Sequence, residues 1–375
     1  MPPGRRTRVL IVDDSAVMRS LLRSVISSDP ALEVAGGVAD GKSALGIVDS
    51  LCPDLILLDV EMPVLDGLST LRKLRESGNR VPVVMCSSLT QRGARITIDA
   101  LAGGASDYVA KPVSQAGVER ATELLAQDLL PRIHALTSAA PQNSASLSRM
   151  TAPESVNAKV RSAPPASIPE IVVIGVSTGG PAALDVLLPA LPSDFRLPIL
   201  VVQHMPELFT RQLATRLDQH CRLRAREAAE GDPVSPGTIY IARGNWHLQV
   251  LAPVNGSSAT LHLAQTPLEN HCRPSVDVLF ASAAAAYGPA VLAVVLTGMG
   301  SDGLAGARSI RKQGGIVLAQ DQASSAVWGM PGVVAAAGLA QHVLPLHALA
   351  AEIRRQAAPR QSNAGSAQES SGTGA

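Results

Sequence analysis

The sequence predicts two α/β domains, each built on a doubly wound and mostly parallel sheet, with a linker between them. Short apolar runs alternate with stretches in which apolar residues recur at helical spacing, a pattern typical of strands that alternate with helices. Only 2% of the 375 residues are aromatic, although 46% are hydrophobic. The cores must therefore consist mainly of aliphatic side chains, which suits parallel sheets covered by helices.

The first domain is expected to span residues 7–125 and to contain five parallel strands. Strands are predicted at Val9–Val12, Leu32–Ala35, Leu55–Leu58, Val83–Met85 and Tyr108–Val109. Between the first two, apolar residues from Met18 to Ile26 recur at helical spacing and predict a helix. A further helical stretch is predicted after Lys111-Pro112, through Leu124, Leu125, Leu129 and Leu130. After it, Pro, Ser and Ala dominate as far as Pro169 without a sustained period, and residues 126–168 are assigned to an interdomain linker.

The second domain is expected to span residues 169–356. Strands are predicted at Ile171–Val176, Pro198–Val202 and Val291–Leu296. The apolar stretch Val278–Leu296 contains a Gly-Pro break, so it predicts a helix, a turn and a buried strand rather than a membrane span. Residues 357–375 are rich in Gly, Ser and Ala and are expected to be disordered.

Charge and cysteine content restrict the classes of partner and compartment. The 32 basic and 31 acidic residues give a net charge of +1, which argues against a mainly electrostatic grip on nucleic acid or on a membrane surface. The four cysteines form no C-x-x-C pair, and no signal peptide fits the N-terminus. We expect a cytoplasmic monomer with no nucleic-acid partner and no direct membrane insertion.

Polar residues follow the predicted strands of the first domain. Asp13 and Asp14 follow the first strand, Asp59 the third, Ser87 the fourth and Lys111 the fifth. The carboxyl ends of parallel strands share one edge of a sheet, where three carboxylates would repel one another unless they bound a cation such as Mg²⁺. A lysine and a hydroxyl there suit the oxygens of a phosphoryl group. The pattern predicts that Asp59 accepts a phosphoryl group as an aspartyl phosphate.

Asp and Ser also follow strands as turn formers and helix N-caps, and Asp14 or Ser15 suits such a cap. The whole set in strand order favours the functional interpretation. With Leu58–Pro63, Asp66-Gly67 and Lys111-Pro112, it resembles a response-regulator receiver domain. The resemblance implies a two-component histidine kinase as the phosphodonor.

The second domain contains a possible nucleophilic serine. Residues 175–179 read G-x-S-x-G, and Ser177 lies where a strand turns into a helix that begins near Pro181. An exposed serine at such a turn can attack a carbonyl, with backbone N–H groups close to the developing oxyanion. The same residues also suit a phosphate-binding turn or a merely tight Gly-rich turn.

A histidine and an aspartate follow two other strands of this domain. His204 comes after Pro198–Val202, and Asp302 lies in the Gly-rich loop after Val291–Leu296. Ser177 would attack, His204 would take its proton and Asp302 would orient the imidazole. His271 is a competing histidine and Asp277 a competing acid, although the apolar helical pattern around Asp277 suits a structural role.

These segments resemble the chemotaxis protein-glutamate methylesterase family. The matching motifs are residues 175–181, Gln203–Pro206, Arg273–Asp277 and Thr297–Gly303. The resemblance implies that Ser177, His204 and Asp302 hydrolyse glutamate methyl esters on chemoreceptors without a cofactor and deamidate certain glutamines, as part of chemotactic adaptation. It also implies that Thr178 and the Met299 N–H line the site, and that phosphorylation of Asp59 relieves inhibition by the receiver.

Three other functions for the second domain compete with the esterase. A DNA-binding regulator would need a helix-turn-helix and a basic face. A nucleotide-binding module would use the turn at Gly179-Gly180, although the spacing of a P-loop is missing. A purely docking domain would show no turnover.

Overall fold

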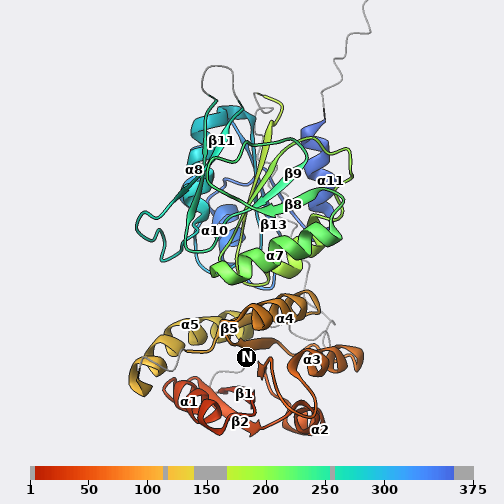
Figure 1. Ribbon diagram of the computed structural model, residues 1–375, viewed down its shortest axis with the longest axis vertical. Coiled ribbons are helices and arrows are strands. Elements are labelled where there is room, and N and C mark those ends of the chain that lie inside the picture. Colours follow the sequence, from red (N-terminus) through yellow and green to blue (C-terminus); the bar gives the residue numbers. More distant parts are fainter. Residues whose placement is uncertain (1–4, 113–116, 139–166, 254–257, 359–375) are drawn as a thin grey trace, which may run out of the picture.

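The computed structural model describes residues 5–112, 117–138, 167–253 and 258–358. They form two α/β domains stacked along the long axis of the molecule (Figure 1). The predicted fold class is confirmed for both domains.

The first domain has a five-stranded parallel sheet in the order β2-β1-β3-β4-β5. Its strands are β1 (Thr7–Val12), β2 (Leu32–Val38), β3 (Leu55–Asp59), β4 (Val83–Ser87) and β5 (Asp107–Ala110). Its helices are α1 (Ala16–Ser27), α2 (Gly41–Leu51), α3 (Gly67–Glu76), α4 (Gln91–Ala102) and α5 (Val118–Ser138). Every residue of β3 and β4 is buried, as expected of central strands that helices cover on both faces.

Polar side chains fix where the helices of this domain begin. The Ser15 hydroxyl accepts a hydrogen bond from the backbone N–H of Met18 and caps α1. Ser15 is therefore the N-cap of α1, and Asp14 does not cap this helix. The interpretation of Asp14 as a ligand of a cation is the one that remains.

Helix α5 extends to Ser138, and thus into the segment 126–168 predicted as linker. Leu125, Leu129 and Ile133 recur at helical spacing and are buried against the receiver sheet and α1. Residues 139–166, the rest of the predicted linker, lie outside the described part of the chain. The predicted tail also lies outside it from residue 359 onward.

The second domain has a seven-stranded parallel sheet in the order β14-β13-β12-β6-β7-β9-β8, with a separate antiparallel pair, β10-β11. Its strands are β6 (Ile171–Val176), β7 (Ile199–Gln203), β8 (Arg224–Glu227), β9 (Thr238–Ile241), β10 (His247–Leu251), β11 (Thr260–Ala264), β12 (Val291–Val295), β13 (Ile316–Gln320) and β14 (His342–Leu344). Its helices are α6 (Gly180–Leu187), α7 (Glu207–His220), α8 (Val276–Tyr287), the 3₁₀ helix η1 (Gly288–Ala290), α9 (Leu304–Lys312), α10 (Met330–Ala336) and α11 (Leu346–Ala357).

The apolar stretch at 278–296 forms most of α8, then η1 and the buried strand β12, as predicted. None of the helices in the described part of the chain combines the length and apolarity that a membrane crossing requires.

The receiver contacts the second domain through α4, which packs against α6 and α7 (Figure 1). The Tyr108 ring stacks on that of Phe209 in α7, with 4.6 Å between the centroids. Arg216 of α7 pairs with Asp99 of α4 at 2.9 Å and also with Asp185 of its own domain. Aromatic stacking and ion pairing thus join the two domains across this interface.

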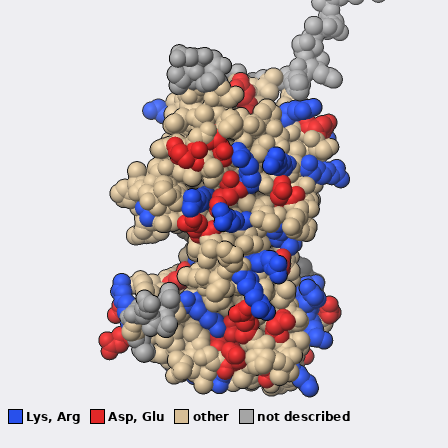
Figure 2. All heavy atoms as spheres, in the orientation of Figure 1, with Lys and Arg blue, Asp and Glu red and all other residues tan. Residues whose placement is uncertain are grey.

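On the face shown in Figure 2, acidic and basic side chains are interleaved over both domains. This distribution agrees with the net charge of +1, and this face offers no broad surface of one sign to a polyanion.

Candidate active site

The predicted phosphorylation site lies at the carboxyl edge of the receiver sheet. Lys111 Nζ lies 2.7 Å from Asp13 Oδ2 and 2.8 Å from Asp59 Oδ1. Both aspartates are buried, and Ser87 is buried at the end of β4, the strand beside that of Asp59. The structure thus gathers these strand-end residues around one point of the sheet.

The acidic residues of this edge suit a divalent cation. One carboxylate oxygen from each of Asp13, Asp14 and Asp59 falls within 4.8 Å of the others. Burial and the nearby Asp13 charge raise the pKa of Asp59 to about 6, although Lys111 opposes the change. A hard cation would offset this repulsion, and carboxylate oxygens are ligands that Mg²⁺ prefers.

Ser177 lies in a sharp turn between β6 and α6. Its N–H donates to Thr297 O at 3.0 Å, which ties the turn to the loop after β12. Gly179 has a φ of +76°, and a Cβ there would lie 2.5 Å from the Ala326 Cβ, so only glycine suits the position. Helix α6 begins at Gly180, with Pro181 in its first turn as predicted. The turn leaves Ser177 partly exposed at the N-terminus of α6.

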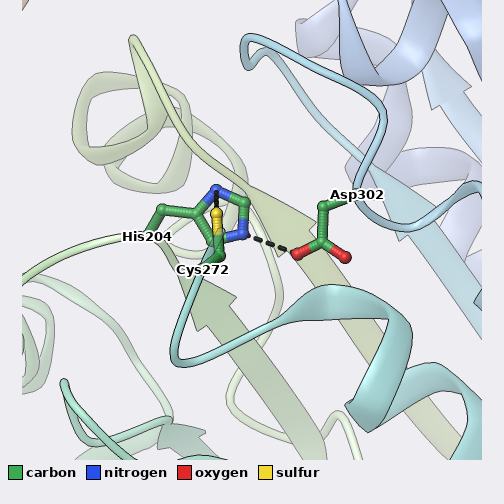
Figure 3. A group of neighbouring side chains, drawn as sticks. All are labelled: His204, Cys272 and Asp302. Atoms are coloured by element: carbon green, nitrogen blue, oxygen red, sulfur yellow. Dashed lines mark hydrogen bonds and ion pairs between the residues drawn. The ribbon is translucent and has the colours of Figure 1, made fainter. Parts of the chain in front are cut away.

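His204 and Asp302 are in direct contact. Strands β12, β6 and β7 are neighbours, so the loops that follow them meet at one edge of the sheet. His204 Nε2 lies 2.8 Å from Asp302 Oδ2 (Figure 3). Burial alone would raise the pKa of Asp302, but His204 and backbone donors, including the Val276 N–H, lower it to about 2. Asp302 is therefore a stable carboxylate partner for the imidazole.

The other ring nitrogen of His204 faces a thiol. Cys272 Sγ lies 3.7 Å from His204 Nδ1 and overlaps the imidazole in the view of Figure 3. Burial would lower the pKa of His204, but its contacts with Asp302 and Cys272 raise it to about 9. The imidazole is therefore mainly cationic at neutral pH in this arrangement.

The Gln203 amide joins the serine loop to the histidine loop. Its Nε2 donates to Ser177 O at 3.0 Å and to His204 O at 3.3 Å. Among the described residues, no hydrogen bond links the Ser177 hydroxyl to His204. The structure therefore pairs His204 with Asp302 and holds Ser177 on the adjacent loop.

Thr178 and Met299 also lie at this edge. The buried Thr178 hydroxyl donates to Asp107 Oδ2 of the receiver at 2.8 Å. Met299 is 37% exposed, and within the described part of the chain its N–H has no hydrogen-bond acceptor. That free N–H suits the predicted oxyanion donor.

The two competing residues have other positions. Asp277 accepts hydrogen bonds from the Gly306 N–H and from Asn270, so it fastens α8 to α9. His271 lines a cavity of about 340 Å³ between the domains. His204 and Cys272 line the same cavity, with Asp128 and Arg132 of α5 on its receiver side.

Sequence reasoning missed several residues around the site. Asn270 and Ser275 both donate to Asp302 Oδ1, at 3.1 and 2.8 Å. Asp107 Oδ2 accepts from Arg132 at 2.7 Å as well as from Thr178. Ser275 belongs to a motif noted in the sequence, but Asp107 carries no local signal, because its partner lies 71 residues away.

Comparison with known proteins decides the family. Residues 172–353 match the family model for CheB methylesterase, and residues 9–123 match that for the response regulator receiver domain. A protein-glutamate methylesterase/protein-glutamine glutaminase from Nocardioides sp. is 51% identical, over 94% of this chain and 95% of its own length. The chain belongs to the CheB methylesterase family.

One more relative and one solved structure are also similar to this CheB methylesterase family member. A protein of the same name from Trichodesmium erythraeum is 47% identical over 93% of this chain and 98% of its own. The crystal structure of the Thermotoga maritima CheB methylesterase catalytic domain is 44% identical and covers 50% of this chain and 98% of that chain, with a TM-score of 0.49. The family assignment favours the esterase over the DNA-binding, nucleotide-binding and docking alternatives.

Proposed function

We propose that the protein is a phosphorylation-activated methylesterase that removes methyl groups from glutamate side chains of chemoreceptors and deamidates some of their glutamines. The observation that carries the proposal is the His204–Asp302 pair, 2.8 Å apart, beside a serine at the end of the neighbouring strand. The names of the relatives supply the substrate class.

In the first step, Ser177 Oγ attacks the ester carbonyl as His204 Nδ1 accepts the serine proton. Asp302 stabilises the resulting imidazolium through Nε2, and the Met299 N–H donates to the oxyanion. The tetrahedral intermediate collapses when the C–O bond to the methoxy group breaks. His204 returns the proton to this oxygen, so methanol leaves and a glutamyl ester of Ser177 remains.

In the second step, water attacks the glutamyl ester, with His204 again acting as the base. The bond to Ser177 Oγ breaks, the serine regains its proton and free glutamate is released. On a glutamine substrate the same sequence releases ammonia instead of methanol. All groups that move protons or hold charge belong to the chain.

The receiver is proposed to control access to this site. Asp59 accepts the phosphoryl group from a histidine kinase, and Asp13, Asp14 and Asp59 would hold Mg²⁺, which supplies charge neutralisation for that transfer. Ser87 and Lys111 contact the transferred oxygens. Because α5 borders the cavity that contains His204, separation of the receiver would widen the entrance for a receptor helix.

The test is release of labelled methanol from a methylated receptor cytoplasmic domain, with and without a small phosphodonor and Mg²⁺. Wild-type protein should be faster with the phosphodonor. Ser177→Ala should lose most of the rate, up to about a million-fold if it acts as in other serine hydrolases. Ser309→Ala, which changes a partly exposed serine on α9, is the matched control and should behave as wild type. A folded Ser177→Ala variant that kept the wild-type rate would refute the assignment.

A further inference from the structure

Cys272 has no part in the proposed esterase mechanism, yet its thiol lies against the base. Cys272 Sγ is 3.7 Å from His204 Nδ1 and overlaps the imidazole in the view of Figure 3, and one ligand atom from each of His204, Cys272 and Asp302 lies within 4.8 Å of the others. A thiol and an imidazole are the ligands that Zn²⁺ prefers. We infer that Cys272 Sγ and His204 Nδ1 form an inhibitory binding site for Zn²⁺.

The spacing of these two atoms suits a tetrahedral ion. Bonds of about 2.3 Å to sulfur and about 2.1 Å to nitrogen, at a tetrahedral angle, place the two ligand atoms about 3.6 Å apart. The 3.7 Å between Cys272 Sγ and His204 Nδ1 is close to this spacing.

Asp302 orients the imidazole and does not coordinate the ion. Its Oδ2 accepts from His204 Nε2 and Val276 N, at 2.8 and 2.7 Å. Its Oδ1 accepts from Ser275, Asn270, Asp277 and Gly303. With both oxygens already bonded, Asp302 keeps a proton on Nε2, so Nδ1 is the ring nitrogen that gives up its proton to bind the metal.

The site has room for the rest of the coordination sphere. His204 and Cys272 both line the interdomain cavity of about 340 Å³, so water can fill the two remaining tetrahedral positions. Binding replaces the Cys272 S–H bond with a sulfur–zinc bond and the Nδ1–H bond of the cationic imidazole with a nitrogen–zinc bond, so at neutral pH it releases two protons to solvent. With only two protein ligands, the ion should exchange and a chelator should remove it.

Occupancy of this site would stop the esterase, a consequence that rests on the proposed function. The Nδ1 lone pair that binds the metal is the one that must accept the Ser177 proton. Zinc at this site therefore competes with proton transfer, and the three aspartates of the receiver edge form a separate candidate cation site.

The primary test uses Co²⁺ in place of Zn²⁺ on the full chain, because a cobalt–thiolate bond gives a charge-transfer absorption band that carboxylate ligands do not. Excess Mg²⁺ occupies the receiver aspartates. Wild-type protein should show the band, Zn²⁺ should abolish it, and Cys272→Ser should lack it. Cys221→Ser is the matched control, since Cys221 is another partly buried free thiol of the same domain, and it should keep the band.

The second test compares Zn²⁺ inhibition of methanol release, with each variant normalised to its own metal-free rate. Cys272→Ser should need at least tenfold more Zn²⁺ than wild type or Cys221→Ser for half inhibition. A cobalt band that persists in Cys272→Ser, or equal zinc sensitivity in all three proteins, would overturn the inference. A band without any esterase activity would instead refute the proposed function and leave the metal site standing.

Discussion

Thr178 donates a hydrogen bond from its hydroxyl to Asp107 of the receiver, at 2.8 Å. Thr178 follows the proposed nucleophile directly, and Asp107 also pairs with Arg132 of α5 at 2.7 Å. One receiver carboxylate, held by Arg132 of its own domain, therefore reaches the rim of the proposed catalytic site.

Replacement of Asp107 by Asn should raise the esterase rate without phosphorylation. The change weakens a hydrogen bond to a charged group, of the kind worth about 1.5–3 kcal/mol, so an increase of about tenfold is expected. Asp128→Asn is the control, because it removes the other carboxylate beside Arg132 and leaves the Thr178 bond in place. Equal basal rates of methanol release in the two variants would count against this role.

The esterase rate of the unphosphorylated protein should rise with pH. Only the neutral imidazole can accept a proton, and the pKa of His204 is raised to about 9. Between pH 7 and 8 the value of kcat/KM should increase nearly tenfold and then level off above about pH 9. Asp302→Asn removes a cause of the raised pKa, so its pH midpoint should move down and its rate should fall. The rate measured with Ser177→Ala gives the background hydrolysis of the ester at alkaline pH, which is subtracted from the wild-type rate. A corrected rate that does not change with pH would contradict the prediction.

Acceptance of a phosphoryl group should fail in mild acid. The pKa of Asp59 is raised to about 6, so below this pH its carboxyl is protonated and is a poor nucleophile. Added Mg²⁺ should shift the midpoint to lower pH, because a cation favours the carboxylate. Lys111→Met should shift it to higher pH, since it removes the neighbouring ammonium. Phosphate-affinity gels, run after reaction with a small phosphodonor at a series of pH values, measure the pH midpoint of phosphorylation. A midpoint that does not change with Mg²⁺ would exclude the three aspartates as the Mg²⁺ site.

Gly175→Ala should destabilise the catalytic domain. A Cβ there would lie 2.3 Å from Val276 Cγ1 of α8, so the helix must shift, at a cost of about 1–3 kcal/mol. Gly46→Ala is the matched control, because a Cβ at this position inside α2 would have no other atom within 4 Å among the described residues. That change should stabilise the receiver by about 0.5–1 kcal/mol. Thermal unfolding measures the melting temperature of both variants. An unchanged melting temperature in Gly175→Ala would contradict the prediction, because it would show that α8 can shift without loss of stability.

The strand-end residues could be predicted because the signal is local. A buried run such as β3 or β6 consists of consecutive apolar residues, so the polar residue that follows it stands out. Parallel topology then places such residues at one edge. The same reasoning predicted that His204 and Asp302 lie at one edge of the sheet, although they are far apart in the sequence.

Other elements could not be predicted, because their signal depends on packing. Strand β8 reads Arg-Ala-Arg-Glu, and the three-residue strand β14 is mostly exposed, so neither forms an apolar run. The partners of Asp107 and the position of Cys272 beside His204 depend on how distant loops and domains meet. The spacing of residues along the chain does not predict such contacts.

The Gln203 amide bridges the backbones of Ser177 and His204, and both belong to the same domain. In the proposed mechanism, the nucleophile Ser177 and the base His204 therefore move together when the receiver separates. On this proposal, phosphorylation alters the proportion of open molecules, while each open molecule turns over at the same rate. In single-turnover kinetics, signalling should change the amplitude of the fast phase and leave its rate constant alone.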